Sequence, residues 1–127
     1  MQTELFERLR AAGLEDARVA HTHVTAYIKA DGSRLSELAA MARMTLPAMS
    51  GLVNDLERLG IVERRPDPRD GRAKLICLTD DGWDAIRIAQ GTISQMEDDY
   101  ARIVGRRRFE SAAGTLDELM RALSERE

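Results

Sequence analysis

The order of patterns in residues 45–79 constrains the fold more than any other feature of this chain. Residues 45–59 repeat apolar side chains at helical spacing, and Gly60 is suited to end that helix. Two short apolar runs follow, at residues 61–62 and 75–79, and their composition favours strands. A helix followed at once by two such strands predicts a β-hairpin that folds back beside the helix.

The segment between the two predicted strands, RRPDPRDGRAK at residues 64–74, is far longer than the about two residues of an ordinary hairpin turn. Seven of its eleven residues are charged, and two of the chain's three prolines lie in it. Residues 58–79 carry six basic and three acidic residues, a net charge of +3 in a chain whose net charge is −3. One interpretation is a solvated loop, and the other is a stiff basic tip that binds an anionic partner such as nucleic acid.

The residues before this helix favour the second interpretation. Ser36 is predicted to cap a short helix in residues 36–43, and Arg43, Met44 and Thr45 form a tight turn. Thr45 is suited to cap the next helix, with Pro47 in its first turn. Two short helices joined in this way can present the second helix to the major groove of DNA. The basic hairpin would then reach the phosphate backbone or the adjoining minor groove, as the wing of a winged helix-turn-helix.

Helical patterns also flank this segment. Residues 3–12 predict one helix, and residues 15–30 predict a second with Val19, His23, Tyr27 and Ala30 along one stripe. Downstream, apolar residues recur at steps of 3, 4, 3, 4 and 3, which is typical of a coiled-coil seam: Ile86, Ala89, Ile93, Met96, Tyr100 and Ile103. A last helix with an apolar stripe follows Gly105. Long amphipathic helices in so small a chain predict a partner chain that buries them.

Two segments, RLSELAAMARMT at residues 34–45 and GLVNDLERLGIVERRPDPRDGRAKLICLTDDG at residues 51–82, resemble the MarR family of winged helix-turn-helix regulators. The resemblance is close over about residues 14–84 and rests on layout elsewhere. It implies a mainly α fold with a small β-hairpin (α+β), in a single domain of residues 1–127. Within it, residues 33–80 would form the winged helix-turn-helix lobe, and residues 1–30 and 84–127 the dimerisation helices.

The resemblance also implies a cytoplasmic homodimer that binds double-stranded DNA at a pseudo-palindromic operator and regulates transcription, as a repressor that a small aromatic effector releases. The DNA-binding residues it implies are Ser36, Arg43, Thr45, Pro47, Ala48, Ser50, Gly51, Asn54, Arg64, Arg65, Arg69, Asp70, Arg72 and Lys74. Arg72 would enter the minor groove, braced by a carboxylate–guanidinium pair with Asp70. The dimerisation residues would be Leu5, Leu9, Ile93, Met96, Tyr100, Phe109, Leu116, Leu119 and Leu123.

The chain departs from the family pattern in its recognition helix. Many members carry a long polar residue at the position of Gly51 and a basic residue at that of Asp55. Here residues 45–57 contain no cation, and Asp55 and Glu57 are acidic. The alternative function is therefore a winged-helix protein-interaction module that has lost DNA binding, although the basic hairpin opposes it.

The two histidines have several interpretations. His21 and His23 are two residues apart, so they do not face one another on a helix, and no cysteine or carboxylate cluster lies near them in the sequence. A metal site is therefore not expected. They are polar residues of the core or interface, or they line the pocket for a small aromatic effector that the resemblance implies.

Other classes of protein lack support in the sequence. No nucleophile–base–acid set, P-loop or GxGxxG motif is present, so neither an enzyme nor a cofactor is expected. The single cysteine, Cys77, lies in a predicted buried strand and favours a reduced cytoplasmic setting. No apolar run approaches the roughly 20 residues of a membrane span. The operator, the effector, the regulated genes and the sign of regulation have no signal in the chain.

Overall fold

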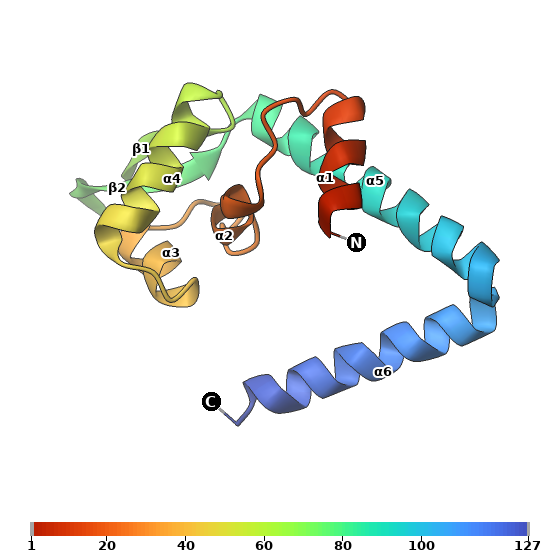
Figure 1. The fold of residues 1–127 in the computed structure, drawn as a ribbon. Coiled ribbons are helices and arrows are strands. Elements are labelled where there is room, and N and C mark those ends of the chain that lie inside the picture. Colours follow the sequence, from red (N-terminus) through yellow and green to blue (C-terminus); the bar gives the residue numbers. More distant parts are fainter. Residues whose placement is uncertain (1, 127) are drawn as a thin grey trace. The chain divides into compact units, whose positions relative to one another are not determined.

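The computed structural model describes residues 2–126 and confirms a mainly α fold with one β-hairpin (Figure 1). Its elements are α1 (Gln2–Ala11), the 3₁₀ helix η1 (Val19–His21), α2 (Thr22–Thr25), α3 (Leu35–Met41), α4 (Leu46–Arg58), β1 (Val62–Asp67), β2 (Asp70–Leu78), α5 (Asp80–Val104) and α6 (Arg106–Ser124). Contacts divide the chain into two units, residues 1–89 and 90–127, with the boundary inside α5. The single domain of residues 1–127 stays a prediction.

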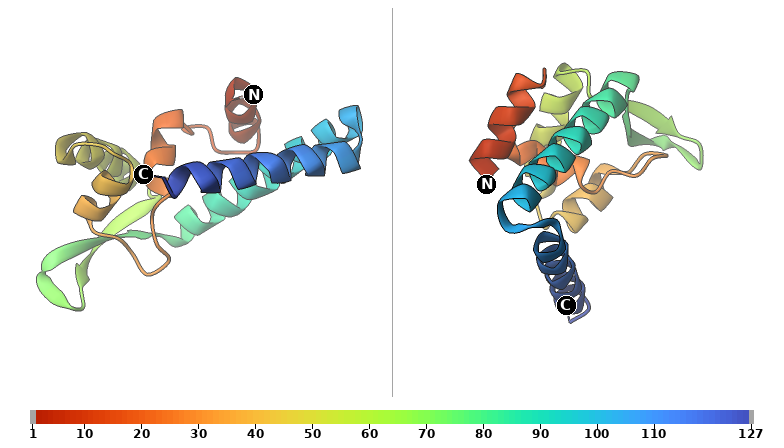
Figure 2. Two further views of the ribbon diagram at one scale, coloured as in Figure 1. Left: turned by 90° about the horizontal axis from the view of Figure 1, so that it is seen from below. Right: turned by 90° about the vertical axis from the view of Figure 1, so that its right-hand side faces the viewer.

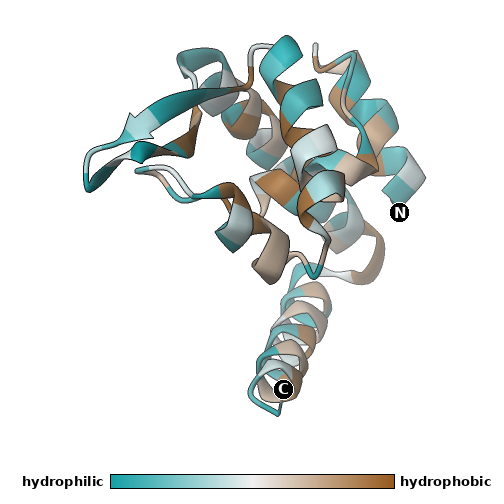
Figure 3. Ribbon diagram, turned by 90° about the vertical axis from the view of Figure 1, so that its left-hand side faces the viewer, coloured by the Kyte–Doolittle hydropathy of each residue, from teal (hydrophilic) through white to brown (hydrophobic). Residues whose placement is uncertain are grey.

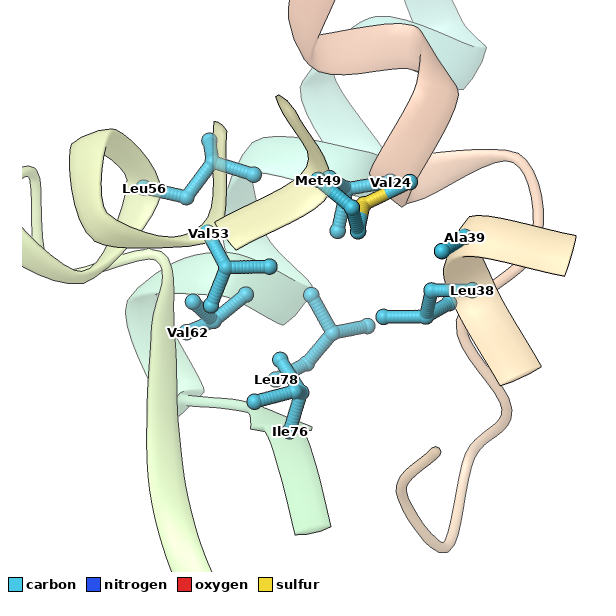
Figure 4. Close-up of a cluster of buried hydrophobic side chains, with 9 residues drawn as sticks. All are labelled: Val24, Leu38, Ala39, Met49, Val53, Leu56, Val62, Ile76 and Leu78. Carbon is cyan, nitrogen blue, oxygen red and sulfur yellow. The ribbon is translucent and has the colours of Figure 1, made fainter. Parts of the chain in front are cut away.

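The core of the first unit lies between the hairpin and the helices α2, α3 and α4. Figure 4 shows its nine buried side chains: Val24, Leu38, Ala39, Met49, Val53, Leu56, Val62, Ile76 and Leu78. The three that come from α4 are spaced by four and three residues, so one face of α4 is buried along the whole helix. Full burial of each large apolar side chain stabilises the fold by about 1.5–3 kcal/mol. This burial fixes which face of α4 remains in solvent.

The predicted ends of α4 are confirmed. The Thr45 hydroxyl accepts a hydrogen bond from the backbone N–H of Ala48 at 3.2 Å, as an N-cap does. Gly60 follows the last turn with φ of 75°, the left-handed conformation that glycine adopts at little cost. Thr79 accepts from the N–H of Gly82 at 2.9 Å and donates to the carbonyl of Gly60. The start of α5 is therefore tied to the end of α4.

The hairpin differs from the long loop expected between two short strands. β1 and β2 pair from Val62 opposite Leu78 to Pro66 opposite Lys74, and only Pro68 and Arg69 lie between them. Residues 64–74 are thus mostly strand, with a register shift at Pro66 and Asp67. A projecting two-stranded ribbon accommodates charged residues because its outer part has no core to fill, and Pro66 lies where the ladder is already irregular. Figure 2 shows the ribbon extending beyond the helices.

A single bridge extends this sheet. Ser33 exchanges two backbone hydrogen bonds with Ile76, at 2.9 and 2.8 Å, so the backbone just before α3 is extended. The helix predicted to begin at Ser36 instead begins at Leu35, with Arg34 in the N-cap position and no side-chain cap. Ser36 is exposed on the first turn. The prediction that Ser36 caps α3 is therefore wrong.

The helix predicted over residues 15–30 is also wrong in extent. Only η1 and α2 form there, and the predicted stripe of Val19, His23, Tyr27 and Ala30 is exposed. His21 and Val24 are buried instead. This stretch is rich in β-branched residues, which lose side-chain freedom in a helix, so tertiary packing rather than helical periodicity decides its shape.

The second unit, residues 90–127, contains the end of α5 and all of α6, joined at Gly105. Arg106 at the start of α6 donates to Asp98 of α5 at 3.0 Å. Leu116, Leu119, Met120 and Leu123 of α6 are between 47% and 63% exposed. Exposing four large apolar side chains to water is unfavourable, and such a stripe is typical of a helix that packs against another surface. No helix within residues 2–126 is long and apolar enough to span a membrane.

Candidate nucleic-acid interface

The two helices α3 and α4 pack as a helix-turn-helix, and the turn between them contains Arg43. Its φ of 55° is left-handed, a conformation that costs a residue other than glycine about 1–2 kcal/mol. Backbone hydrogen bonds hold the turn: the N–H of Arg43 donates to Ala40 at 3.2 Å, and that of Met44 donates to Ala39 at 2.8 Å. The turn therefore sets the orientation of α4 relative to α3.

The exposed face of α4 follows from its buried face. Because Met49, Val53 and Leu56 are buried, the opposite side carries Pro47, Gly51, Asn54 and Arg58, all of which are exposed. Of the other predicted contacts on this helix, Ala48 is exposed, Ser50 is half-buried and Thr45 is the exposed N-cap. The structure therefore brings the predicted base-facing residues to one accessible side of the protein.

The acidic residues of α4 are paired with cations. Arg64 of β1 donates to Asn54 Oδ1 at 2.9 Å and to Glu57 Oε1 at 2.6 Å. Asp55 forms an ion pair with Arg58 one turn later. Exposed pairs of this kind add less than about 1 kcal/mol to stability, yet each cancels a negative charge. Arg64 thus supplies the cation that α4 lacks in its own sequence up to residue 57.

The hairpin, which we call the wing (residues 62–78), presents the remaining cations. Arg65 pairs with Glu63 on the same strand. Arg69, Arg72 and Lys74 are exposed, and no ion pair holds them within residues 2–126. Figure 3 shows that the outer part of the wing is largely hydrophilic. Three accessible cations on a projecting ribbon match the anionic backbone of a nucleic acid.

Asp70 contacts the backbone of Arg72 and not its guanidinium, which differs from the ion pair that the resemblance implies. Asp70 Oδ1 accepts a hydrogen bond from the backbone N–H of Arg72 at 3.1 Å, and no carboxylate–guanidinium pair joins the two described side chains. Asp67 makes the same kind of turn with the N–H of Arg69 at 2.9 Å. Both aspartates therefore form the Asx turns that such residues favour. These turns shape the wing backbone and leave the guanidinium of Arg72 in solvent.

Arg34 is a residue that sequence reasoning missed. Its Nε and Nη2 donate to Asp67 Oδ2 at 3.1 and 2.8 Å, although the two residues are 33 positions apart. Asp67 is only 5% exposed. The hydrogen bond from the Arg69 N–H and then the Arg34 guanidinium hold the pKa of this carboxyl below its ordinary value. The pair joins the tip of the wing to the N-terminus of α3, so it orients the wing relative to the helix-turn-helix.

The two histidines lie in different surroundings. His21 is buried and lines a cavity of about 300 Å³, whereas His23 is exposed and does not line that cavity. The His21 ring has no hydrogen-bond partner among the described residues. Burial and then the nearby Arg18 lower its pKa, against an opposing effect of Asp16, which favours the neutral ring. No group of three or more metal-binding side chains forms in the described part of the chain.

The cavity beside His21 has an apolar interior. Side chains from α1, α4 and the first half of α5 form its walls, among them Phe6, Leu9, Leu56 and Ile86. Arg18 and Asp16 also line it, and both line a second cavity of about 220 Å³ together with Asp55 and Arg58. A mainly apolar cavity with a few polar groups suits a small organic molecule.

Two comparisons with known proteins place this fold. The MarR family model matches residues 20–73, which confirms the resemblance seen in the sequence. The MepR–DNA complex of S. aureus has 23% identity and a TM-score of 0.72 over 96% of this chain and 93% of that chain. YusO from Bacillus subtilis has 18% identity and a TM-score of 0.73 over 94% and 86%.

A third solved structure is the transcriptional repressor CouR bound to a 23-mer DNA duplex, with 20% identity and a TM-score of 0.65 over 94% of this chain and 86% of that chain. At these identities the likeness shows a winged helix-turn-helix fold. No curated protein matches this chain in sequence.

We expect Asp67→Asn to loosen the wing, because the amide keeps the turn to Arg69 but loses the charge that holds Arg34. Backbone amides of residues 62–78 should exchange hydrogen faster than in the parent. The ionised carboxylate stabilises the fold above its ordinary pKa, and this contribution is lost as the pH falls through its lowered pKa. The difference in unfolding free energy between parent and variant should therefore be constant near neutral pH and shrink below about pH 4.

Asp70→Asn is the matched control, because Asp70 is exposed and makes only the backbone hydrogen bond to Arg72. If both substitutions change amide exchange equally, the ion pair between Arg34 and Asp67 does not orient the wing.

Proposed function

We propose that this chain is a transcriptional regulator that binds a pseudo-palindromic operator in double-stranded DNA as a cytoplasmic homodimer and acts as a repressor. The observation that carries the proposal is the wing: Arg69, Arg72 and Lys74 are unpaired within the described chain, on a ribbon oriented beside α4. The match to the MarR family and the DNA complexes of MepR and CouR support it.

The rival function, a winged-helix protein-interaction module, rests on the acidic residues of α4. The ion pairs of Asp55 with Arg58 and of Glu57 with Arg64 weaken that case, because neither carboxylate would meet a phosphate as an isolated negative charge. A mobility-shift assay on the DNA upstream of the protein's own gene separates the two functions. Binding that falls steeply with salt concentration supports the regulator, and absence of binding at low salt supports the rival.

Arg72→Ala should weaken operator binding by about 2 kcal/mol per half-site and lower the slope of log affinity against log salt by about one. The reason is the loss of one cation that contacts phosphate or the minor groove, with no change to the core, since Arg72 is exposed. Fluorescence anisotropy at two salt concentrations measures both quantities.

Arg10→Ala serves as the control, because Arg10 is exposed as Arg72 is, and its helix α1 lies away from the wing (Figure 1). Its affinity and salt slope should match those of the parent. Equal losses in the two variants would show that net charge, and not the wing, sets the affinity.

The homodimer is proposed from the exposed apolar stripe of α6. Leu9 and Met96 are already buried within one chain, so Ile93, Leu116, Leu119 and Leu123 are the exposed members of the predicted interface, with Leu5, Tyr100 and Phe109 half-buried. Interfaces of permanent dimers bury upwards of roughly 2,000 Å². Covering this stripe would remove from water apolar surface that a monomer leaves exposed.

Sedimentation at low micromolar concentration should show a dimer for the parent and monomer for Leu119→Glu, because a charge buried in the interface would lack a partner. Ser111→Glu is the control, since Ser111 is exposed on the side of α6 away from the apolar stripe. A parent protein that is a folded monomer would overturn both the dimer and the two-half-site operator.

We also propose that a small aromatic effector enters the cavity beside His21 and releases the protein from DNA. The His21 ring, whose lowered pKa favours the neutral form, offers a hydrogen-bonding group to a cavity that Arg18 also lines. A panel of aromatic acids and phenols, tested by thermal shift and by release from DNA, should contain a stabilising compound. His21→Leu should weaken its binding roughly fivefold to tenfold through the lost hydrogen bond.

His23→Leu is the matched control, because His23 is exposed and lines none of the described cavities. It should bind the same compound as the parent does. Weaker binding of the compound in both variants, or no thermal shift and no release from DNA with any compound, would contradict an aromatic effector at this cavity.

A further inference from the structure

The N-terminal turn of α4 exposes apolar residues at positions 46–48. Leu46 is 51% exposed, and Pro47 and Ala48 beside it are exposed as well. From residue 46 to residue 53 the only polar side chain is that of Ser50. Gly51 also lies on the exposed face, and an added Cβ there would meet nothing within 4 Å. A recognition helix enters the major groove by its N-terminal residues, so this smooth apolar end would meet the base edges.

The four base pairs differ in what they offer in the major groove. Guanine presents two acceptors that Arg or Lys reads, cytosine presents a donor for a carboxylate, and adenine suits the two-pronged amide of Asn or Gln. Thymine presents one acceptor, O4, and the only apolar group, its 5-methyl. An apolar helix end therefore matches thymine and no other base.

The polar residues of α4 agree with this assignment. Arg58, in the last turn, is its only cation and is paired with Asp55, and the other carboxylate of α4, Glu57, is paired with Arg64. Asn54 Oδ1 accepts from Arg64, which disfavours the two-pronged contact with adenine and leaves the amide N–H groups as donors. Such donors suit an acceptor, and thymine O4 is one.

We propose that α4 reads thymine through its methyl group, with Leu46 as the main specificity-determining residue and Pro47 and Ala48 beside it. The proposal rests on the proposed function as a DNA-binding regulator. The absence of a side chain at Gly51 lets the helix backbone come close to the base edges. The operator therefore carries A·T pairs where the N-terminus of α4 meets each half-site.

The charges around the apolar end favour DNA over a protein as the occupant. Arg64 lies along the side of α4, and Arg69, Arg72 and Lys74 project on the wing of the same unit. A row of cations next to an apolar end suits phosphates next to thymine methyl groups. An apolar protein partner would leave these cations without anions.

The test uses a duplex selected from a randomised library by the full-length protein. Each thymine in the half-sites is then replaced in turn by deoxyuridine, which removes only the methyl and keeps O4 and the base pairing. We expect binding to weaken about fourfold at each contacted thymine, as for one buried methyl group. Leu46→Ala should weaken binding to the thymine duplex. At the base that Leu46 contacts, this variant should bind the thymine and deoxyuridine duplexes with equal affinity.

Met41→Ala is the matched control, because Met41 is an apolar residue of α3 that is 53% exposed. The Met41→Ala variant should show the same difference in affinity between the thymine and deoxyuridine duplexes as the parent protein. Thermal unfolding checks that Leu46→Ala remains folded, as expected for a half-exposed side chain. If that variant unfolds, Leu46→Ser on the same duplexes replaces it, with the same expected result.

The outcomes separate this inference from the function on which it rests. If selection recovers no duplex, the DNA-binding function fails and the thymine contact fails with it. If a duplex is recovered but deoxyuridine binds as well as thymine at every position, the function stands and the inference is overturned. If the folded Leu46 variant still binds the thymine duplex more tightly than the deoxyuridine duplex at every position, the assignment of the methyl contact to Leu46 is overturned.

Discussion

The wing depends on being held at both ends by the short segment that precedes α3. An isolated two-stranded hairpin is marginally stable in water, and the outer part of this one has charged residues in place of a core. Near its base, Ser33 pairs with Ile76 through two backbone hydrogen bonds. At its tip, Arg34 binds Asp67. Two consecutive residues therefore fix a projecting ribbon in two places, and the cations of the wing keep their position relative to α4.

This arrangement separates affinity from base recognition. Free cations lie on the wing, whereas the first half of α4 carries none and the acidic residues further along it are neutralised by Arg58 and Arg64. Contacts to phosphate position a protein on DNA without reading its sequence, and contacts to base edges read it. A cationic wing beside an apolar helix end assigns these two tasks to different elements, and a chain of net charge −3 can in this way present a locally basic surface.

The sequence predicted what local chemistry determines and missed what long-range contacts determine. The cap at Thr45, the glycine after α4 and the hairpin each depend on neighbouring residues and were confirmed. Arg34 could not be found in this way, because its partner lies 33 positions away and its own position would suit an ordinary helix cap. The stretch around His21 has a helical period in its apolar residues, but packing of His21 and Val24 overrides it. The site residues on α4 and the wing were placed by family resemblance, and their roles stay predictions.

In the proposed function, α4 connects base recognition with the cavity beside His21. Leu56 of α4 and Leu59 just after it line that cavity, and Asp55 and Arg58 of α4 line a second cavity that His21 also lines. A ligand can shift the protein between two conformations only if it binds one of them more tightly. A molecule that fits the cavity only when Leu56 and Leu59 move would therefore favour a different position of α4. Because α4 is buried along its whole inner face, such a shift would move it as a rigid element and displace its exposed N-terminus together with its back. Release from DNA by the proposed effector would thus require no contact between that molecule and the wing.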